Sequence, residues 1–322
     1  MRKSLTLLAC IGTLAFSVPA AAAPTNTGDI FAAIGNGQVA HYNHSGTLIE
    51  TLNTGQGGYT TGMAFDGAGN LQVTNFSAGN TTRFNSNGVI VAPNPYVSPG
   101  SSPESIAYAQ DGSFYVGRAG GSPQHYSSTG TLLQTYSTSG ASDWIDLAAD
   151  QTTLFYNDEG GTIRRLNVAT NTPLADFANN TAHGGTNSYA LRLLGNGDVI
   201  SAAGSLITQY NAVGAFLGSY DVTGVDGFFA LNLDPDGTHF WSGSFNNGTL
   251  YEFLIGGFGS NSSIASINTG SASLFGVALA GEITVGGPPT NGVPEPSTWA
   301  MMLLGFAGIG MAIRRRPRLA IA

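Results

Sequence analysis

The 322-residue chain is poor in cysteine and in charged side chains, and both shortages exclude classes of chemistry. Its single cysteine, Cys10, lies in a segment that we expect to be removed, so the mature protein would hold no disulfide, no thiolate nucleophile and no cysteine metal site. Charged residues make up only 9% of the chain, against about 25% in typical domains. Asn, Thr, Ser and 46 glycines take their place, a texture common in secreted β-proteins.

Basic residues are scarce away from the two ends of the chain. Six of the eleven lie in the terminal segments, and five remain between them: Arg83, Arg118, Arg164, Arg165 and Arg192. All nineteen acidic residues lie between Asp29 and Glu295, which leaves the exported part with a net charge of −14. Nucleic acid is excluded as a partner because phosphate binding needs basic patches. Cations or neutral glycans suit this surface better.

Several catalytic motifs are also missing. The chain has no Gly-x-Ser-x-Gly elbow, no zinc-type histidine pair on a helix, no P-loop and no dinucleotide fingerprint. Asp234-Pro-Asp-Gly237 lacks the distal Glu of a calcium loop and is interpreted as a hairpin turn. His41 and His44 lie three apart in a strand-and-turn region, so their side chains are expected on opposite faces and not as a metal pair.

The first 22 residues have the pattern of a secretory signal peptide. Arg2 and Lys3 precede an apolar run from Leu5 to Val18, and four alanines supply small residues for cleavage. We expect the cut between Ala22 and Ala23. A cut one residue later would place Pro24 directly after the cleaved bond, which makes a poor substrate.

The C-terminal end combines a short motif, an apolar segment and a basic stop. Pro294, Glu295 and Pro296 open it, an apolar stretch runs from Trp299 to Ile313, and Arg314, Arg315 and Arg316 follow. This order and spacing resemble the PEP-CTERM sorting tail of exported proteins of Gram-negative bacteria. The resemblance implies handling by an exosortase-type membrane protease at the inner membrane.

The apolar stretch predicts one transmembrane helix over residues 298–313, with a basic cytoplasmic stop at 314–322. Fifteen residues of helix reach roughly 22 Å, short of a hydrocarbon core about 30 Å thick, and Trp299 and the arginines would bridge the rest. The protein would face the periplasm until processing, and then reach the cell surface or the extracellular matrix. Residues 287–297 form the Pro/Gly linker that carries the motif.

Residues 28–286 contain an internal repeat. An apolar strand, a Gly/Asp/Asn turn and a second strand recur at intervals of 40 to 45 residues, starting at Gly62, Ser105, Ile145, Ala190, Leu231 and Gly276. This period, with several short strands per unit, predicts an all-β, six-bladed β-propeller. The last inner strand, Leu274–Ala280, has almost no chain left to complete its blade. We therefore expect Asp29–Ala33, Gln38–Asn43 and Thr47–Leu52 to share that blade and close the ring.

The residues within the repeats resemble one type of propeller repeat. Thr61-Gly-Met-Ala-Phe-Asp-Gly-Ala-Gly-Asn-Leu-Gln-Val-Thr-Asn75 looks like an NHL-type repeat, and Glu104–Gly117 is a looser copy. The resemblance implies the fold shared by the senescence-marker/gluconolactonase hydrolases and by many binding modules. Fold alone does not choose between the two.

The segments that precede the inner strands hold the candidates for chemistry. Oxygen ligands come from four of them: Glu104, Asp143, Asn187 and Asp226. Nearby loops carry Asp158 and Glu159. Convergent oxygens suit Ca²⁺, although these four residues are staggered relative to the repeat. Aromatic residues of the same segments would form a sugar-stacking rim: Tyr59, Trp144, Tyr189 and Phe228. Solvated loop acids and core-filling aromatic rings are the alternative interpretations.

These features favour a non-enzymatic surface or matrix protein with no required cofactor, whose propeller binds exopolysaccharide or another surface component. A calcium-dependent hydrolase or lactonase is the competing hypothesis. An adhesin or protein-binding scaffold is the third.

Overall fold

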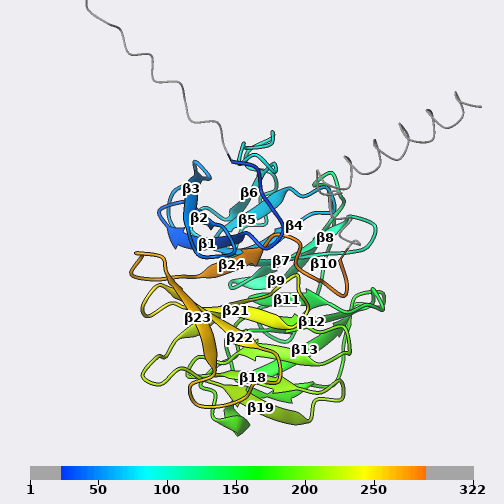
Figure 1. Cartoon of the computed structure of the whole chain (residues 1–322). Helices are drawn as coiled ribbons and strands as arrows, with labels where there is room; N and C mark the ends of the chain where they lie inside the picture. Colours follow the sequence, from blue (N-terminus) through cyan, green and yellow to red (C-terminus); the bar gives the residue numbers. More distant parts are fainter. Residues whose placement is uncertain (1–22, 288–322) are drawn as a thin grey trace, which may run out of the picture.

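The computed structural model describes residues 23–287, which form six antiparallel sheets arranged as the blades of a propeller (Figure 1). The predicted all-β, six-bladed fold is confirmed. Within this described part of the chain, no helix has the length and apolar character needed to cross a membrane. The signal peptide, the sorting motif and the predicted transmembrane helix lie outside the described residues.

The closing blade combines both ends of the propeller, and the other blades follow along the chain. It contains β1 (Ile30–Gly35), β2 (Gln38–Tyr42), β3 (Leu48–Asn53) and β24 (Gly276–Leu279). The second blade contains β4 (Thr60–Phe65), β5 (Leu71–Asn75) and β6 (Asn80–Phe84). The third contains β7 (Pro103–Tyr108), β8 (Phe114–Arg118), β9 (Gly121–Tyr126) and β10 (Leu132–Thr135).

The last three blades complete the ring. The fourth contains β11 (Trp144–Leu147), β12 (Thr153–Asn157), β13 (Thr162–Asn167), β14 (Thr172–Pro173) and β15 (Ala178–Asn179), and the 3₁₀ helix η1 (Asn180–His183) follows it. The fifth contains β16 (Leu191–Leu193), β17 (Val199–Ala202), β18 (Ile207–Tyr210) and β19 (Phe216–Tyr220). The sixth contains β20 (Phe228–Leu233), β21 (His239–Ser244), β22 (Thr249–Leu254) and β23 (Ser263–Asn268).

Apolar residues on both faces of each blade pack against the neighbouring blades. The inner strands β24, β4, β7, β11, β16 and β20 contact one another in that order and β20 returns to β24, so the ring is closed. Six clusters of buried apolar side chains lie between successive blades, one at each interface. The core is therefore divided among the interfaces, and each blade depends on both neighbours.

The predicted closure is confirmed. β1 pairs antiparallel with β24, with Ile30 opposite Leu279 and Ala33 opposite Gly276. Figure 1 shows β1 and β24, which come from opposite ends of the propeller, side by side in this blade. Hydrogen bonds extend the pairing beyond the strands, since Ala280 N donates to Asp29 O at 2.9 Å and Gly28 N to Ala280 O at 2.8 Å.

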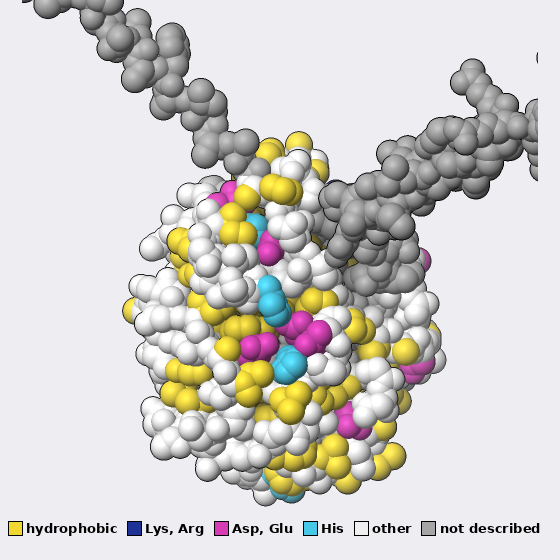
Figure 2. Space-filling model, viewed as in Figure 1, with side chains coloured by type: hydrophobic (Ala, Val, Ile, Leu, Met, Phe, Trp, Pro, Cys, Tyr) yellow, Lys and Arg dark blue, Asp and Glu magenta, His cyan; other side chains and the backbone are white. Residues whose placement is uncertain are grey.

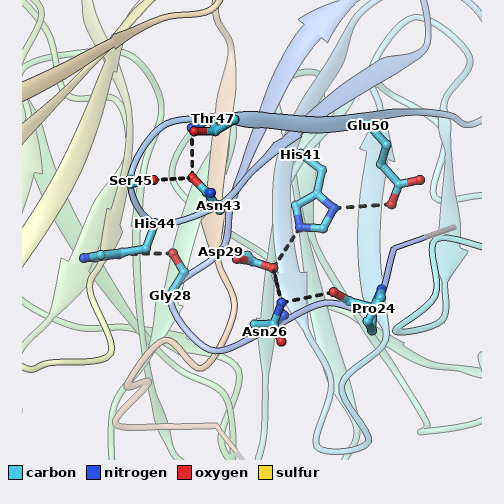
Figure 3. Close-up of polar contacts among 10 residues, drawn as sticks. All are labelled: Pro24, Asn26, Gly28, Asp29, His41, Asn43, His44, Ser45, Thr47 and Glu50. Atoms are coloured by element: carbon cyan, nitrogen blue, oxygen red, sulfur yellow. Dashed lines mark hydrogen bonds and ion pairs between the residues drawn. The ribbon is translucent and has the colours of Figure 1, made fainter.

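A buried histidine connects Asp29, just before β1, to the strands of the closing blade (Figure 3). The imidazole of His41 is fully buried and stacks on Phe31. Its Nε2 lies 3.0 Å from Asp29 Oδ2 and its Nδ1 lies 3.3 Å from Glu50 Oε1. Because this β2 ring lies between Asp29, which precedes β1, and Glu50 of β3, His41 has a structural role. His44 points elsewhere, as the sequence predicts.

Two blades depart from the expected four strands. The second has only three, because the chain after β6 contains Pro93 and Pro95, which lack an N–H for a ladder. That segment still covers β6, with Val91 N donating to Arg83 O and Tyr96 N to Thr81 O, both at 2.7 Å. In the fourth blade, the outer strand is split into β14 and β15, which both pair with β13.

Candidate functional site

The channel mouth is the end of the propeller formed by the segments that precede the six inner strands. Adjacent segments are tied by direct contacts: Thr61 Oγ1 donates to Pro103 O at 3.2 Å and Ser105 Oγ to Asp143 O at 2.6 Å. Ile145 N donates back to Ser105 Oγ at 3.1 Å. The side chain of Ser105 thus bridges the third and fourth blades and fixes the position of Asp143.

Three carboxylates converge at this mouth. Glu104, Asp143 and Glu159 each present one oxygen, and these oxygens all lie within 4.8 Å of one another. Glu104 and Asp143 are each 2% exposed, while Glu159 is exposed. Glu104 Oε2 and Asp143 Oδ1 are buried and have no hydrogen-bond partner within residues 23–287. Such uncompensated buried oxygens cost stability unless a cation or proton satisfies them. We call these three residues the acidic trio.

The electrostatics of the trio follow from this crowding. Burial raises the pKa of Glu104 well above its usual range, and the charges of Asp143 and Glu159 raise it further. Burial, Glu159 and Asp158 raise the pKa of Asp143 to about 7. Burial and Asp158 also raise the pKa of Glu159. A divalent cation would reverse these shifts, because an opposite charge favours the ionised form.

The loop between β12 and β13 places Glu159 beside Glu104 and Asp143. Glu159 has a φ of 62°, a left-handed conformation that is uncommon for a residue other than glycine. Asn187 holds this loop, since its Nδ2 donates to Glu159 O at 2.9 Å. Arg164 forms an ion pair with Asp158 beside it.

The four oxygen candidates from the sequence do not all meet. The structure brings Glu104 and Asp143 together, and Asn187 contacts the trio only through the backbone of Glu159. Asp226 is exposed and lies outside the group, and its carbonyl accepts a hydrogen bond from Ser244 Oγ at 2.7 Å. Glu159, from the loop after β12, takes the third place. In the sequence, Glu159 is indicated only by its position in the loop between the second and third strands of a blade.

The aromatic candidates divide in the same way. Trp144 is 1% exposed and Phe228 is fully buried, so both belong to the core between the fifth and sixth blades. Tyr59 is 53% exposed and Tyr189 is half-buried. Both tyrosines belong to a connected set of rings, in which Tyr59 packs on Phe275, Phe275 on Phe229, and Phe229 on Tyr189. The sequence did not single out Phe229 or Phe275. One side of the mouth is therefore acidic, and the other is aromatic.

All five histidines of the chain lie away from the acidic trio. His183, which precedes Asn187 in sequence, stacks on Phe216 with ring centroids 4.1 Å apart. His125 stacks on Tyr115, and His41 lies between Asp29 and Glu50. His44 contacts Gly28 O, and His239 pairs with Asp236. Imidazole is thus not the base or a ligand beside the trio.

A buried ion triplet lies at the ends of the inner strands opposite the mouth, and the sequence analysis missed it. Arg192 Nε donates to Glu282 Oε1 at 2.8 Å and also to Asn232 Oδ1. Asp146 Oδ2 accepts from Leu193 N at 2.9 Å. Burial raises the pKa of Glu282 to about 7 despite the opposing charge of Arg192. These groups join three inner strands and have partners, so we regard them as structural.

Comparison with solved structures defines the class of protein. A chain in a crystal structure of a nidogen/laminin complex superposes with a TM-score of 0.61 at 13% identity, over 78% of this chain and 98% of that one. The β-propeller domain of Cps50 (Swd1) from Myceliophteria thermophila gives a TM-score of 0.53 at 11% identity, over 79% and 89%. At these identities the likeness shows the fold alone. The chain is a six-bladed β-propeller protein.

The sequence comparison adds where the protein is sent. Residues 292–316 match the PEP-CTERM protein-sorting motif, as the tail predicted. This motif implies exosortase-dependent export, with anchoring at the membrane before processing. No curated protein matches the sequence of this chain. The NHL-type and gluconolactonase-type interpretation of the repeats stays a prediction.

Proposed function

We propose that the exported propeller is a non-enzymatic binding module, and that its channel mouth holds a calcium ion and takes a glycan of the cell surface or matrix. The observation that carries this proposal is the pair of buried, unpartnered oxygens of Glu104 and Asp143, which converge with Glu159. Ca²⁺ takes about six to eight oxygen ligands, and water completes sites that offer fewer protein groups. The trio supplies hard, anionic oxygens only, which suits this cation.

The aromatic half of the mouth supports the glycan. Tyr59 is exposed, and Tyr189 is half-buried beside Phe229. Exposed aromatic faces stack on the apolar faces of sugar rings, while a bound cation coordinates hydroxyl or carboxylate oxygens. A mostly uncharged, acidic protein also favours a neutral glycan, or an anionic one bridged by calcium. Exopolysaccharide is the ligand class that this combination fits.

Calorimetry with CaCl₂ on the full exported chain in detergent tests the metal. Glu104→Gln and Asp143→Asn are expected to weaken binding by at least about tenfold, since each removes a charged ligand. Asp226→Asn is the matched control, because Asp226 is a carboxylate of the same face outside the trio. Absence of calcium binding by the unchanged chain would contradict the proposal, and so would equal losses in the control.

Binding to exopolysaccharide isolated from the host tests the ligand. Tyr59→Ala and Tyr189→Ala are each expected to lower affinity about three- to tenfold, the magnitude of an aromatic contact. Tyr96→Ala serves as the control, since this tyrosine packs against Arg83 in the second blade. Unchanged affinity in both mouth variants would argue against the aromatic rim.

A calcium-dependent hydrolase or lactonase is the second candidate, and one observation favours it. The pKa of Asp143, raised to about 7, is suited to general acid–base catalysis at neutral pH. A panel of lactones and phosphoesters separates the two functions. Turnover that requires calcium and is lost in Asp143→Asn would establish the enzyme and overturn the binding module.

A third candidate is an adhesin or protein scaffold. A propeller of similar fold occurs in the crystal structure of a nidogen/laminin complex, so this architecture is compatible with protein assembly. Surface pull-downs with the mouth variants distinguish it, because a scaffold that uses the outer strands would keep its partner when Tyr59 and Tyr189 are replaced.

We also propose that the chain is cut shortly after Pro296 and then released from the inner membrane to the surface or matrix. The sorting motif at residues 292–316 supports this. Mass spectrometry of the surface fraction is expected to lack peptides that contain Trp299–Ile313. Recovery of those peptides in the mature protein would show a permanent anchor instead.

A further inference from the structure

A second group of ligating side chains lies on the face of the propeller opposite the channel mouth, where the closing blade meets the sixth blade. His44 comes from the turn between β2 and β3, Asp234 from the turn after β20, and Glu252 from β22. Each offers one ligand atom, and these atoms all lie within 4.8 Å of one another. Figure 2 shows histidine and acidic side chains gathered at the centre of this face. The acidic trio of the channel mouth shares no residue with this group.

The surroundings orient each member. Asp234 is 2% exposed, its Oδ1 accepts from Asp236 N at 3.1 Å, and its Oδ2 accepts from the Trp241 indole at 3.4 Å. The same Oδ2 lies 3.7 Å from His44 Nδ1. Trp241 is opposite Glu252 in the β21–β22 register, so both side chains lie on the same face of the sixth blade.

The backbone of the closing blade places His44. Its Nδ1 lies 3.2 Å from Gly28 O, and Figure 3 shows the ring beside this carbonyl. Gly28 has a φ of 86°, and a Cβ on it would lie 3.1 Å from His44 Nδ1. Position 28 therefore requires a glycine, both for its positive φ and for the space that the His44 imidazole occupies. A carbonyl that accepts the Nδ1–H of a histidine fixes its tautomer and leaves the Nε2 lone pair for a metal.

We propose that His44, Asp234 and Glu252 form a zinc site that clamps the closing blade to the sixth blade. An imidazole with two carboxylates suits a divalent transition metal, whereas calcium prefers oxygen alone. Zinc binds nitrogen and oxygen at about 2.0–2.2 Å, so a centred ion requires each ligand atom to move by about 1 Å or less. The exposed His44 ring and the half-buried Glu252 side chain have room for this. Water takes the remaining position.

Two neighbouring groups complete the environment. His239 pairs with Asp236 at the edge of the group. Burial raises the pKa of Glu252, and the charges of Asp234 and Asp236 add to this against the opposing effect of the two histidines. The site thus holds three carboxylates and two imidazoles, a net negative charge that a divalent cation neutralises.

The clamp would act on the seam of the ring. The closing blade is the only one in the described chain that is built from both ends of the propeller, so its opening separates the N-terminal strands from the rest. A metal bond between the β2–β3 turn and the sixth blade opposes that separation. Since zinc would bind the folded state alone, it stabilises that state increasingly as its concentration rises above its Kd.

Metal titration of the full exported chain, stripped with a chelator and kept in detergent, tests the proposal. One equivalent of ZnCl₂ is expected to bind, and CoCl₂ is expected to give the visible absorption of a low-coordinate Co²⁺ site. His44→Ala and Glu252→Gln are each expected to weaken zinc binding by at least about 100-fold, beyond the roughly 10–100-fold typical of an outer partner. Zinc is expected to raise the melting temperature of the unchanged chain but not that of either variant.

Two controls make the result specific. His183→Ala removes another exposed imidazole, which stacks on Phe216, and should bind zinc unchanged. Glu104→Gln alters the acidic trio and should also retain the zinc site. The proposal is overturned if the unchanged chain binds no zinc, if His44→Ala and Glu252→Gln bind as well as it does, or if Glu104→Gln abolishes binding.

Discussion

Single residues at the blade interfaces determine how closely the inner strands approach one another. Gly117 on β8 lies against the chain that enters the fourth blade. A Cβ on it would lie 2.2 Å from Ser105 Oγ, 2.5 Å from Ser142 O and 2.7 Å from Asp143 O. Two of these atoms belong to the backbone and cannot move alone. The absence of a side chain at Gly117 thus allows Asp143 to lie close to Glu104 and Glu159.

Gly117→Ala is expected to lower the free energy of unfolding by about 1–3 kcal/mol, the usual cost of overpacking, and to displace Asp143. Chemical denaturation and calcium calorimetry would measure both effects. Gly195→Ala is the control, since a Cβ there meets nothing within 4 Å and its φ is not in the left-handed range. A Gly117→Ala chain as stable as this control would contradict the packing argument.

Arg192 is the only cation of the buried ion triplet. Arg192→Met is expected to cost about 3–5 kcal/mol of unfolding free energy at pH 8, because Asp146 and Glu282 would stay buried without their partner. The pKa of Glu282 is raised to about 7, so the folded state holds its proton more tightly than the unfolded state does. Stability from this group is therefore present at low pH and is lost as pH rises towards 7.

The loss in Arg192→Met should accordingly be smaller at pH 5 than at pH 8. Denaturation curves at the two pH values provide the measurement. Adding Glu282→Gln should recover part of the loss at pH 8, since it removes one uncompensated charge. A destabilisation that does not change with pH would show that lost packing, and not charge, is the cause.

At the scale of elements, the closing blade depends on three strands from one end of the chain and one from the other. β1 covers the edge of β24, and the side chains of β1 to β3 complete the apolar clusters at both of its interfaces. An uncovered edge and two exposed apolar faces favour aggregation. The N-terminal strands therefore contribute to the stability of the whole ring.

Deleting residues 23–53 is expected to abolish cooperative thermal unfolding and to make the remaining chain sensitive to protease. Circular dichroism during heating and limited proteolysis would show this. Deletion of residues 23–25 alone, ahead of the Asn26–Asp29 contacts, is the milder control. A cooperative transition at the original temperature in the longer deletion would mean that the ring closes without these strands.

At the scale of the whole molecule, pH and calcium should act together on stability. The pKa values of Glu104 and Asp143 are both raised, that of Asp143 to about 7. Without metal, the folded state binds their protons more tightly, so the free energy of unfolding contributed by these groups falls as pH rises from about 4 through 7. Calcium binds the deprotonated form, so its stabilising effect should grow over the same range.

Thermal melts with and without calcium at pH 5, 6.5 and 8 would test this coupling. The rise in melting temperature is expected to be largest at pH 8 and to disappear in Asp143→Asn. A calcium effect that is equal at all three pH values would place the ion outside the acidic trio.

The ring of blades could be predicted from the sequence more fully than the sites on it. The six inner strands and the shared blade could be predicted because each repeat carries its own alternation and turn residues, such as Asp111-Gly112 between β7 and β8. The missing fourth strand of the second blade follows from Pro93 and Pro95, which lack the N–H that a strand ladder requires. Rim residues were less predictable, because position before an inner strand does not determine whether a side chain is buried.

The sequence by itself determined the repeat number, the ring closure and the sorting motif, since all three depend on local patterns and their spacing. Only the tertiary structure decided which side chains meet. Glu159 reaches Glu104 and Asp143 because of a left-handed turn, and Asp226 stays outside because it precedes the sixth blade, which adjoins neither the third blade nor the fourth. His44 meets Asp234 and Glu252 across a blade interface, although these residues lie 190 and 208 positions further along the sequence. Such contacts depend on the stagger and angle between packed blades, which no local pattern specifies.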